Sequence, residues 1–219
     1  MIRLAFSSIR LRRTITAITA SGLAVAGMLV AVPSASAAPA DDTLLASYAI
    51  SGTTAIASTK SSMNLGPGTL DATLDVDNNT FTADLSLPPA TGSFTELGFL
   101  PVTAVTEFVQ SGATTGSIDG DTGGMSSTSH VIIRLTDVKI AGIDVGVGNN
   151  CQTTPATINL TSEDGFNVLT GGNVSGTYTI PKFSNCGLLN TPIINAVIPG
   201  AGNTITLTLG EPTVTVPSS

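Results

Sequence analysis

The sequence has few charged and few aromatic residues. Only 11% of its 219 residues are Asp, Glu, Lys or Arg, 4% are aromatic, and Trp is absent. With 8 Lys and Arg against 15 Asp and Glu, it lacks the basic surface that a nucleic-acid binder needs to neutralise phosphates. Two Cys and one His are too few for a multi-cysteine zinc module, and the sparse charge excludes the charged heptads of a coiled coil.

The first 37 residues have the pattern of an export signal. Four Arg precede an uncharged apolar stretch over residues 15–32, Pro33 ends it, and Ala35 and Ala37 supply the small residues of a signal-peptidase site. We predict that residues 1–37 are a secretion signal peptide, that residues 38–219 form one domain, and that the protein is secreted, extracellular or in the cell envelope. A permanent anchor is the alternative, because about 18 apolar residues can just span a bilayer.

Removal of the leader makes the chain more acidic. The leader holds four of the 8 Lys and Arg and none of the 15 acids, so the remaining 182 residues have a net charge of −11. Thirty of those 182 residues are Thr, a β-branched residue that suits a half-buried pleated surface. The composition favours a β domain that displays hydroxyl groups rather than charges.

Strict alternation of apolar and polar residues predicts a β-hairpin. Residues 69–76 and 80–87 both alternate, and Asp77-Asn78-Asn79 between them has the composition of a turn. Pro88 and Pro89 end the second strand, because proline has no N–H to donate.

Further strands are predicted in the remaining alternating or β-branched segments, with no long helical pattern and no domain boundary between them. The segments are residues 46–59, with Gly52 as a bulge, and 102–110, 130–140, 157–161, 174–180, 204–209 and 213–216. Glycine-rich and acidic turns separate them at residues 66–68, 119–124, 148–150, 163–165 and 171–173. Many short strands with frequent turns predict an all-β antiparallel sandwich or barrel.

One apolar segment near the C-terminus breaks this pattern. Residues 183–210 carry no charge, and Thr191 as N-cap with Pro192 after it predicts a short helix that continues to residue 198. Such a helix either plugs one end of the β core or acts as a lid or contact surface for a lipid or membrane. The apolar residues 97–102 could line the same region. The candidate ligand contacts are Phe99, Leu100, Leu188, Leu189, Ile193, Ile194, Val197 and Ile198.

Cys151 and Cys186 are the only cysteines, and an isolated pair in an exported chain predicts a disulfide. A redox role is disfavoured, because there is no Cys-x-x-Cys motif and no cation close to either residue.

Catalytic and metal-binding patterns are weak. His130 is the only imidazole, no Gly-x-Ser-x-Gly motif supplies a nucleophile, and 15 acids make any carboxylate pair unspecific. Residues 75–79 place oxygen ligands as in a calcium loop, but Thr80 and Ser86 replace its Gly and Glu. We interpret this segment and the acidic turn at residues 119–123 as hairpin turns, and we predict no catalytic, cofactor or metal residues.

Several segments resemble a group of secreted actinobacterial proteins of unknown function. They are residues 48–54, 65–70, 85–94, 98–103 and 178–183, the last running on to Cys186-Gly187. The resemblance implies export and assigns no residue a role. The sequence thus predicts a secreted non-catalytic β domain that binds an apolar ligand, a lipid or a cell-envelope component. A structural or adhesive surface module and a carboxylate-dependent hydrolase are the alternatives.

Overall fold

The computed structural model describes residues 43–217. The predicted leader and cleavage site lie outside these residues. Fourteen strands and one helix follow in the order β1 (Thr43–Ile56), β2 (Ser61–Asp75), β3 (Thr80–Ser86), β4 (Ala90–Glu96), β5 (Leu100–Gln110), β6 (Thr114–Ile118), β7 (Met125–Ile140), β8 (Ile143–Asp144), β9 (Gln152–Thr153), β10 (Ala156–Ser162), β11 (Gly172–Ile180), β12 (Phe183–Ser184), α1 (Asn190–Val197), β13 (Gly200–Leu209) and β14 (Thr213–Thr215).

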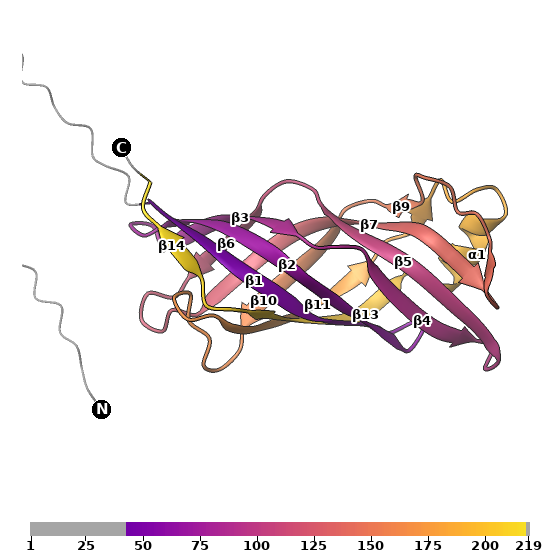
Figure 1. Ribbon diagram of the computed structural model, residues 1–219, viewed down its shortest axis with the longest axis horizontal. Coiled ribbons are helices and arrows are strands. Elements are labelled where there is room, and N and C mark those ends of the chain that lie inside the picture. Colours follow the sequence, from indigo (N-terminus) through magenta and orange to yellow (C-terminus); the bar gives the residue numbers. More distant parts are fainter. Residues whose placement is uncertain (1–42, 218–219) are drawn as a thin grey trace, which may run out of the picture. The chain divides into compact units, whose positions relative to one another are not determined.

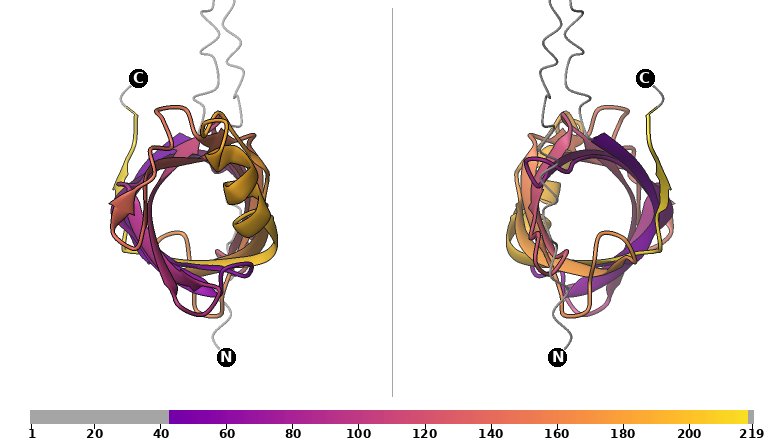
Figure 2. Two further views of the ribbon diagram at one scale, coloured as in Figure 1. Left: turned by 90° about the vertical axis from the view of Figure 1, so that its right-hand side faces the viewer. Right: turned by 90° about the vertical axis from the view of Figure 1, so that its left-hand side faces the viewer.

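The strands form a closed antiparallel barrel, which answers the open choice between sandwich and barrel. The hydrogen-bonded order is β10-β11-β13-β1-β2-β3-β6-β7, and β7 pairs with β10 to close the ring. Figure 2 shows the ring end on, and Figure 1 shows the strands running obliquely along its length. Side chains of alternating residues fill the interior with one hydrophobic cluster.

Two positions in the barrel wall are each occupied by two strands that follow one another in sequence. β3 and β4 run in the same direction, separated by residues 87–89, and β5 and β6 are separated by residues 111–113. Accordingly β3 pairs with β6, whereas β4 pairs with β5. Gln110 lies where these pairs meet: its side-chain amide accepts from Leu85 N and donates to Ala83 O at 2.8 Å. A side chain therefore replaces backbone pairing at this junction.

The predicted hairpin is confirmed. Leu74 faces Phe81 and Ala72 faces Ala83 across β2 and β3, and all four are buried. Val76 is instead 48% exposed in the turn, and β3 ends before the two prolines. The bulge predicted at Gly52 is confirmed by a register shift between Ile50 and Gly52.

One predicted turn lies within a strand. Residues 66–68 belong to β2, where Gly66 has a φ of 83° and precedes a cis peptide bond to Pro67. Proline fits here because residues 61–68 pair with β1 on one edge only. The pattern also missed β4 and β6, whose Ser, Thr and Gly residues hide the alternation of apolar side chains.

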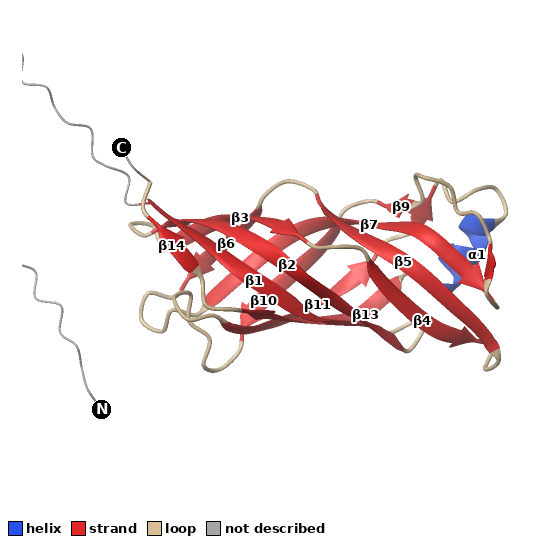
Figure 3. Cartoon of the chain, in the orientation of Figure 1, coloured by secondary structure: helices blue, strands red, loops and turns tan. Residues whose placement is uncertain are grey.

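The helix α1 covers part of one end of the barrel (Figure 3). It begins at Asn190, and its N-cap is Leu189, which has no side-chain capping bond. The predicted N-cap, Thr191, lies inside the helix and donates its hydroxyl to Gly187 O at 2.7 Å. Within residues 43–217, no helix is long and apolar enough to cross a membrane.

Candidate functional site

Large apolar side chains are exposed around the end of the barrel that carries α1, which we name the α1 end. Phe99 in the β4–β5 turn is 74% exposed, and Leu188 and Leu189 before α1 are 96% and 80% exposed. Leu97, Ile143 and Ile193 belong to the same exposed set. Soluble domains rarely leave several large apolar groups in one region without a partner, so this end is the first candidate for a binding surface.

Hydrogen bonds hold the loops of this end together. Ala141 N, in the β7–β8 turn, donates to Pro101 O of β5 at 2.8 Å. The Asn190 side chain of α1 donates to Val145 O, just after β8, at 2.8 Å. The β4–β5 turn, the β7–β8 turn and the segment before α1 therefore lie together at one end of the barrel (Figure 1).

The structure brings the eight candidate contacts to this end but gives them different roles. Phe99, Leu188, Leu189 and Ile193 are exposed, Ile194 is buried against the barrel, and Leu100, Val197 and Ile198 are partly buried. The helix thus acts neither as a wholly buried plug nor as a free lid, because one face packs inward and the other faces solvent. Leu97 was covered by the predicted range 97–102, whereas Ile143 was missed as an isolated residue in a turn.

The predicted disulfide is confirmed, and it anchors the α1 segment. Cys151 and Cys186 are bonded and fully buried. A second link comes from Asn195 of α1, whose side chain accepts from Phe183 N at 2.7 Å and donates to Phe183 O at 2.8 Å. The amide hydrogen-bonds to the backbone as a neighbouring strand would, so these polar contacts fix the helix to β12, and the disulfide fixes the segment before the helix to Cys151.

An apolar cavity lies inside the barrel in the half next to α1. Its lining residues come from seven strands, the β1–β2 turn and Ile198, and none is charged: Ile56, Thr59, Ser61, Met63, Gly92, Phe94, Ala104, Thr106, Phe108, Ile133, Leu135, Tyr178, Ile180, Phe183 and Ile198. The cavity volume is about 40 Å³. One water needs roughly 10–15 Å³, so the cavity suits one narrow apolar group.

The hydroxyl of Tyr178 is satisfied at the edge of this cavity. It lies 2.8 Å from Thr54 Oγ1, and Thr54 donates in turn to Thr204 O at 2.9 Å. Burial raises the pKa of Tyr178, because the low-dielectric interior disfavours the phenolate. The residue therefore presents a neutral ring to the cavity at physiological pH.

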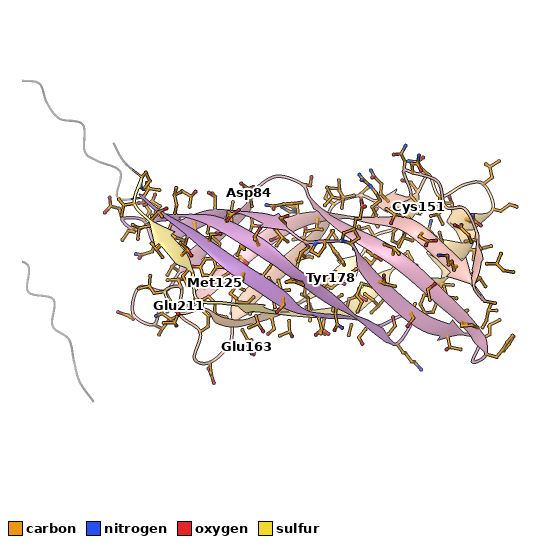
Figure 4. All side chains as sticks on the ribbon, in the orientation of Figure 1. Asp84, Met125, Cys151, Glu163, Tyr178 and Glu211 are labelled. Carbon is orange, nitrogen blue, oxygen red and sulfur yellow. A yellow bond between two sulfur atoms is a disulfide. The ribbon has the colours of Figure 1, made fainter. Side chains whose placement is uncertain are left out.

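Charge divides the barrel into two unlike ends. The turns opposite α1, with the segment before β14, form what we name the acidic end, and they contain Asp75, Asp77, Asp119, Asp121, Glu163, Asp164 and Glu211. All four basic residues of the described chain lie in the other half: Lys60, Arg134, Lys139 and Lys182. Figure 4 places Glu163 and Glu211 at one end and Cys151 near the other.

The candidate catalytic and metal patterns do not converge. His130 is exposed on the outer face of β7, with Nδ1 3.3 Å from Thr157 Oγ1. Asp75 accepts from the side-chain amide and then the backbone N of Asn78, and Asp119 accepts from the backbone N of Thr122; these hydrogen bonds lower the pKa of both carboxyls. Among residues 43–217, no group of three or more His, Cys, Asp or Glu could hold a metal ion.

No protein-family model, curated protein or solved structure matches this chain. The functional argument therefore rests on the barrel itself and on the chemistry of its two ends.

Proposed function

We propose that this protein is an exported, non-catalytic β-barrel that binds an apolar ligand or an apolar surface of the cell envelope through its α1 end. The observation that carries the proposal is the set of exposed apolar side chains around that end, led by Phe99, Leu188 and Leu189. Burial of one such side chain against a partner contributes about 1.5–3 kcal/mol. Export is supported by the leader pattern and by the buried disulfide, which is typical of oxidising compartments.

The charge distribution supports an oriented encounter with such a surface. The acidic end has seven carboxylates and, among the described residues, no Lys or Arg in its turns. An anionic envelope surface would repel this end and favour approach of the α1 end, where lysines balance the acids.

A vesicle flotation assay with anionic phospholipid tests this function. We expect Leu188→Ser with Leu189→Ser to reduce the bound fraction by at least about tenfold, because the two lost contacts are worth several kcal/mol. The matched control is Val214→Ser with Val216→Ser, which changes two exposed apolar residues in the C-terminal segment away from α1. Mass spectrometry of lipid extracts tests for a co-purified ligand. Equal flotation of both variants, together with a clean extract, would contradict the proposal.

A structural or adhesive surface module is the second candidate. Its support is a hydroxyl-bearing outer face on neighbouring strands, where Thr53 of β1, Thr206 of β13 and Ser175 of β11 lie opposite one another. Cell-wall fractionation separates the two, since an adhesive module stays with the wall after Leu188 and Leu189 are replaced.

A further inference from the structure

The barrel wall has a seam between β2 and β4. These strands lie side by side, yet residues 61–68 of β2 pair only with β1, and β4 pairs only with β5. Pro88 and Pro89 precede β4 and interrupt the line of strand that would otherwise continue the pairing of β3 with β2. Unlike the other neighbouring strands of the ring, these two can separate without breaking a backbone ladder.

Met63 of β2 and Gly92 of β4 meet across this seam beside the apolar cavity. Met63 and Gly92 both line the cavity, and the position of a Cβ on Gly92 would be 3.0 Å from Met63 Cε. Methionine is unbranched and flexible, so its tip can swing aside at low cost. Glycine leaves room for that movement, because it brings no side chain of its own.

A cation lies between two lining residues of the cavity in the β1–β2 turn. Lys60 is exposed between Thr59 and Ser61, which line the cavity and share a hydrogen bond of 2.7 Å. Neither of the two salt bridges among residues 43–217 uses Lys60. A ligand with an apolar chain in the cavity could therefore place an anionic group beside Lys60.

We infer that one unbranched acyl chain with an anionic head enters the barrel sideways between β2 and β4, with Met63 as the gate. The uncharged lining selects the chain, the narrow space excludes bulkier groups, and Lys60 meets the head. This inference rests on the proposed function and names its ligand class and its route of entry.

A reversible crosslink across the seam tests the route. A Cβ on residue 92 lies 3.7 Å from Met63 Cβ, within the roughly 3.5–4.5 Å that a disulfide requires. The test variant is Met63→Cys with Gly92→Cys, and the control is Thr115→Cys with Thr128→Cys, which staples partners on the already paired β6 and β7. The native disulfide is fully buried, so mild reduction opens the new bond first, as mass spectrometry can verify.

The probe is cis-parinaric acid, a fluorescent straight-chain fatty acid, measured by stopped-flow. We expect 1:1 binding to the unmodified protein, at least about a tenfold slower association with the oxidised 63–92 crosslink, and recovery on reduction. The control crosslink should leave the rate unchanged. Equal association with the oxidised 63–92 variant would overturn the entry route. Should that variant fail to fold, Met63→Ala replaces it: faster entry supports the gate, and an unchanged rate overturns it.

The two proposals fail in distinguishable ways. Flotation that depends on Leu188 and Leu189, without parinarate binding, overturns the acyl-chain site and leaves the proposed function standing. Absence of both flotation and parinarate binding rejects the proposed function and the acyl-chain site together.

The head group and the source of the chain are tested separately. Lys60→Gln should weaken the affinity for parinarate about twofold to fivefold, as loss of an exposed ion pair does. The affinity for parinaryl alcohol, which has no charge, should stay unchanged. An equal loss of affinity for both probes overturns the role of Lys60. Comparison of free parinarate with vesicles of parinaroyl phosphatidylglycerol then distinguishes a free fatty acid from a membrane lipid.

Discussion

The two ends of the barrel differ in charge and in how the wall is closed, and the three most exposed large apolar side chains, Leu188, Leu189 and Leu97, lie at the α1 end. At the acidic end, continuous backbone pairing joins β2, β3, β6 and β7, and the turns carry carboxylates. At the α1 end, backbone ladders still join β1 to β2 and β5 to β7, but the wall also uses a disulfide, amide side chains and, between β2 and β4, Met63. The comparison teaches that one end is built for a stable, solvated surface, whereas the other leaves apolar groups and an unpaired seam available to a partner.

Removal of the disulfide should give the largest difference in local stability between the two ends of the barrel. Cys151→Ser with Cys186→Ser opens a loop with a sequence separation of 35, and we expect a loss of about 3–4 kcal/mol in the free energy of unfolding. Hydrogen exchange should accelerate in residues 183–198 and change little in the turns of the acidic end. Uniform acceleration along the barrel would contradict a locally fixed α1 segment.

Two glycine substitutions compare the packing of the walls. A Cβ on Gly116 would be 2.3 Å from Phe81 Cζ and 2.5 Å from Ser126 O, whereas a Cβ on Gly92 meets only Met63. We expect Gly116→Ala to cost about 1–3 kcal/mol through overpacking, and Gly92→Ala to stay within about 0.5 kcal/mol. Urea denaturation measures both. Equal costs would mean that the seam is as tightly packed as the β3–β6 wall.

High pH should destabilise the protein through its two buried tyrosines. Burial raises the pKa of Tyr48 to about 12 from 10.0, and also raises that of Tyr178. Because only the unfolded chain ionises readily above pH 10, their stabilising contribution is complete below that value and is lost as pH rises toward the folded-state pKa. Tyrosinate absorbance reports the pKa of the one remaining tyrosine in each variant, Tyr178 in Tyr48→Phe and Tyr48 in Tyr178→Phe. Titration of both phenols at the ordinary pKa would refute this account.

The smallest effect is expected from the carboxylates of the acidic end. Hydrogen bonds lower the pKa of Asp75 and Asp119 below 3.8, so their stabilising contribution is present above that value and is lost as pH falls through the folded-state pKa. Asp119→Asn should therefore make melting temperature less sensitive to acid. Asp164→Asn in the adjacent β10–β11 turn is the control, and an identical response of both variants would contradict the prediction.

The sequence predicted the regular parts of this fold better than the irregular ones. Alternation located the β2–β3 hairpin and the bulge at Gly52, because each inward residue there is plainly apolar. It missed β4, where Gly92 is an inward position without a side chain. The exposed residues before α1 were predicted as contacts from their lack of charge. The cavity and the seam depend on which strands become neighbours, and local periodicity carries no information about that.

The junction at Gln110 divides the barrel wall into two parts that a side chain, not a backbone ladder, holds together. Since one carboxamide, rather than a ladder, joins the end of β3 to the end of β5, the linkers at residues 87–89 and 111–113 can change in length without altering the register of either half. Small insertions in either linker should therefore change the half of the wall beside α1 while the turns of the acidic end stay as they are.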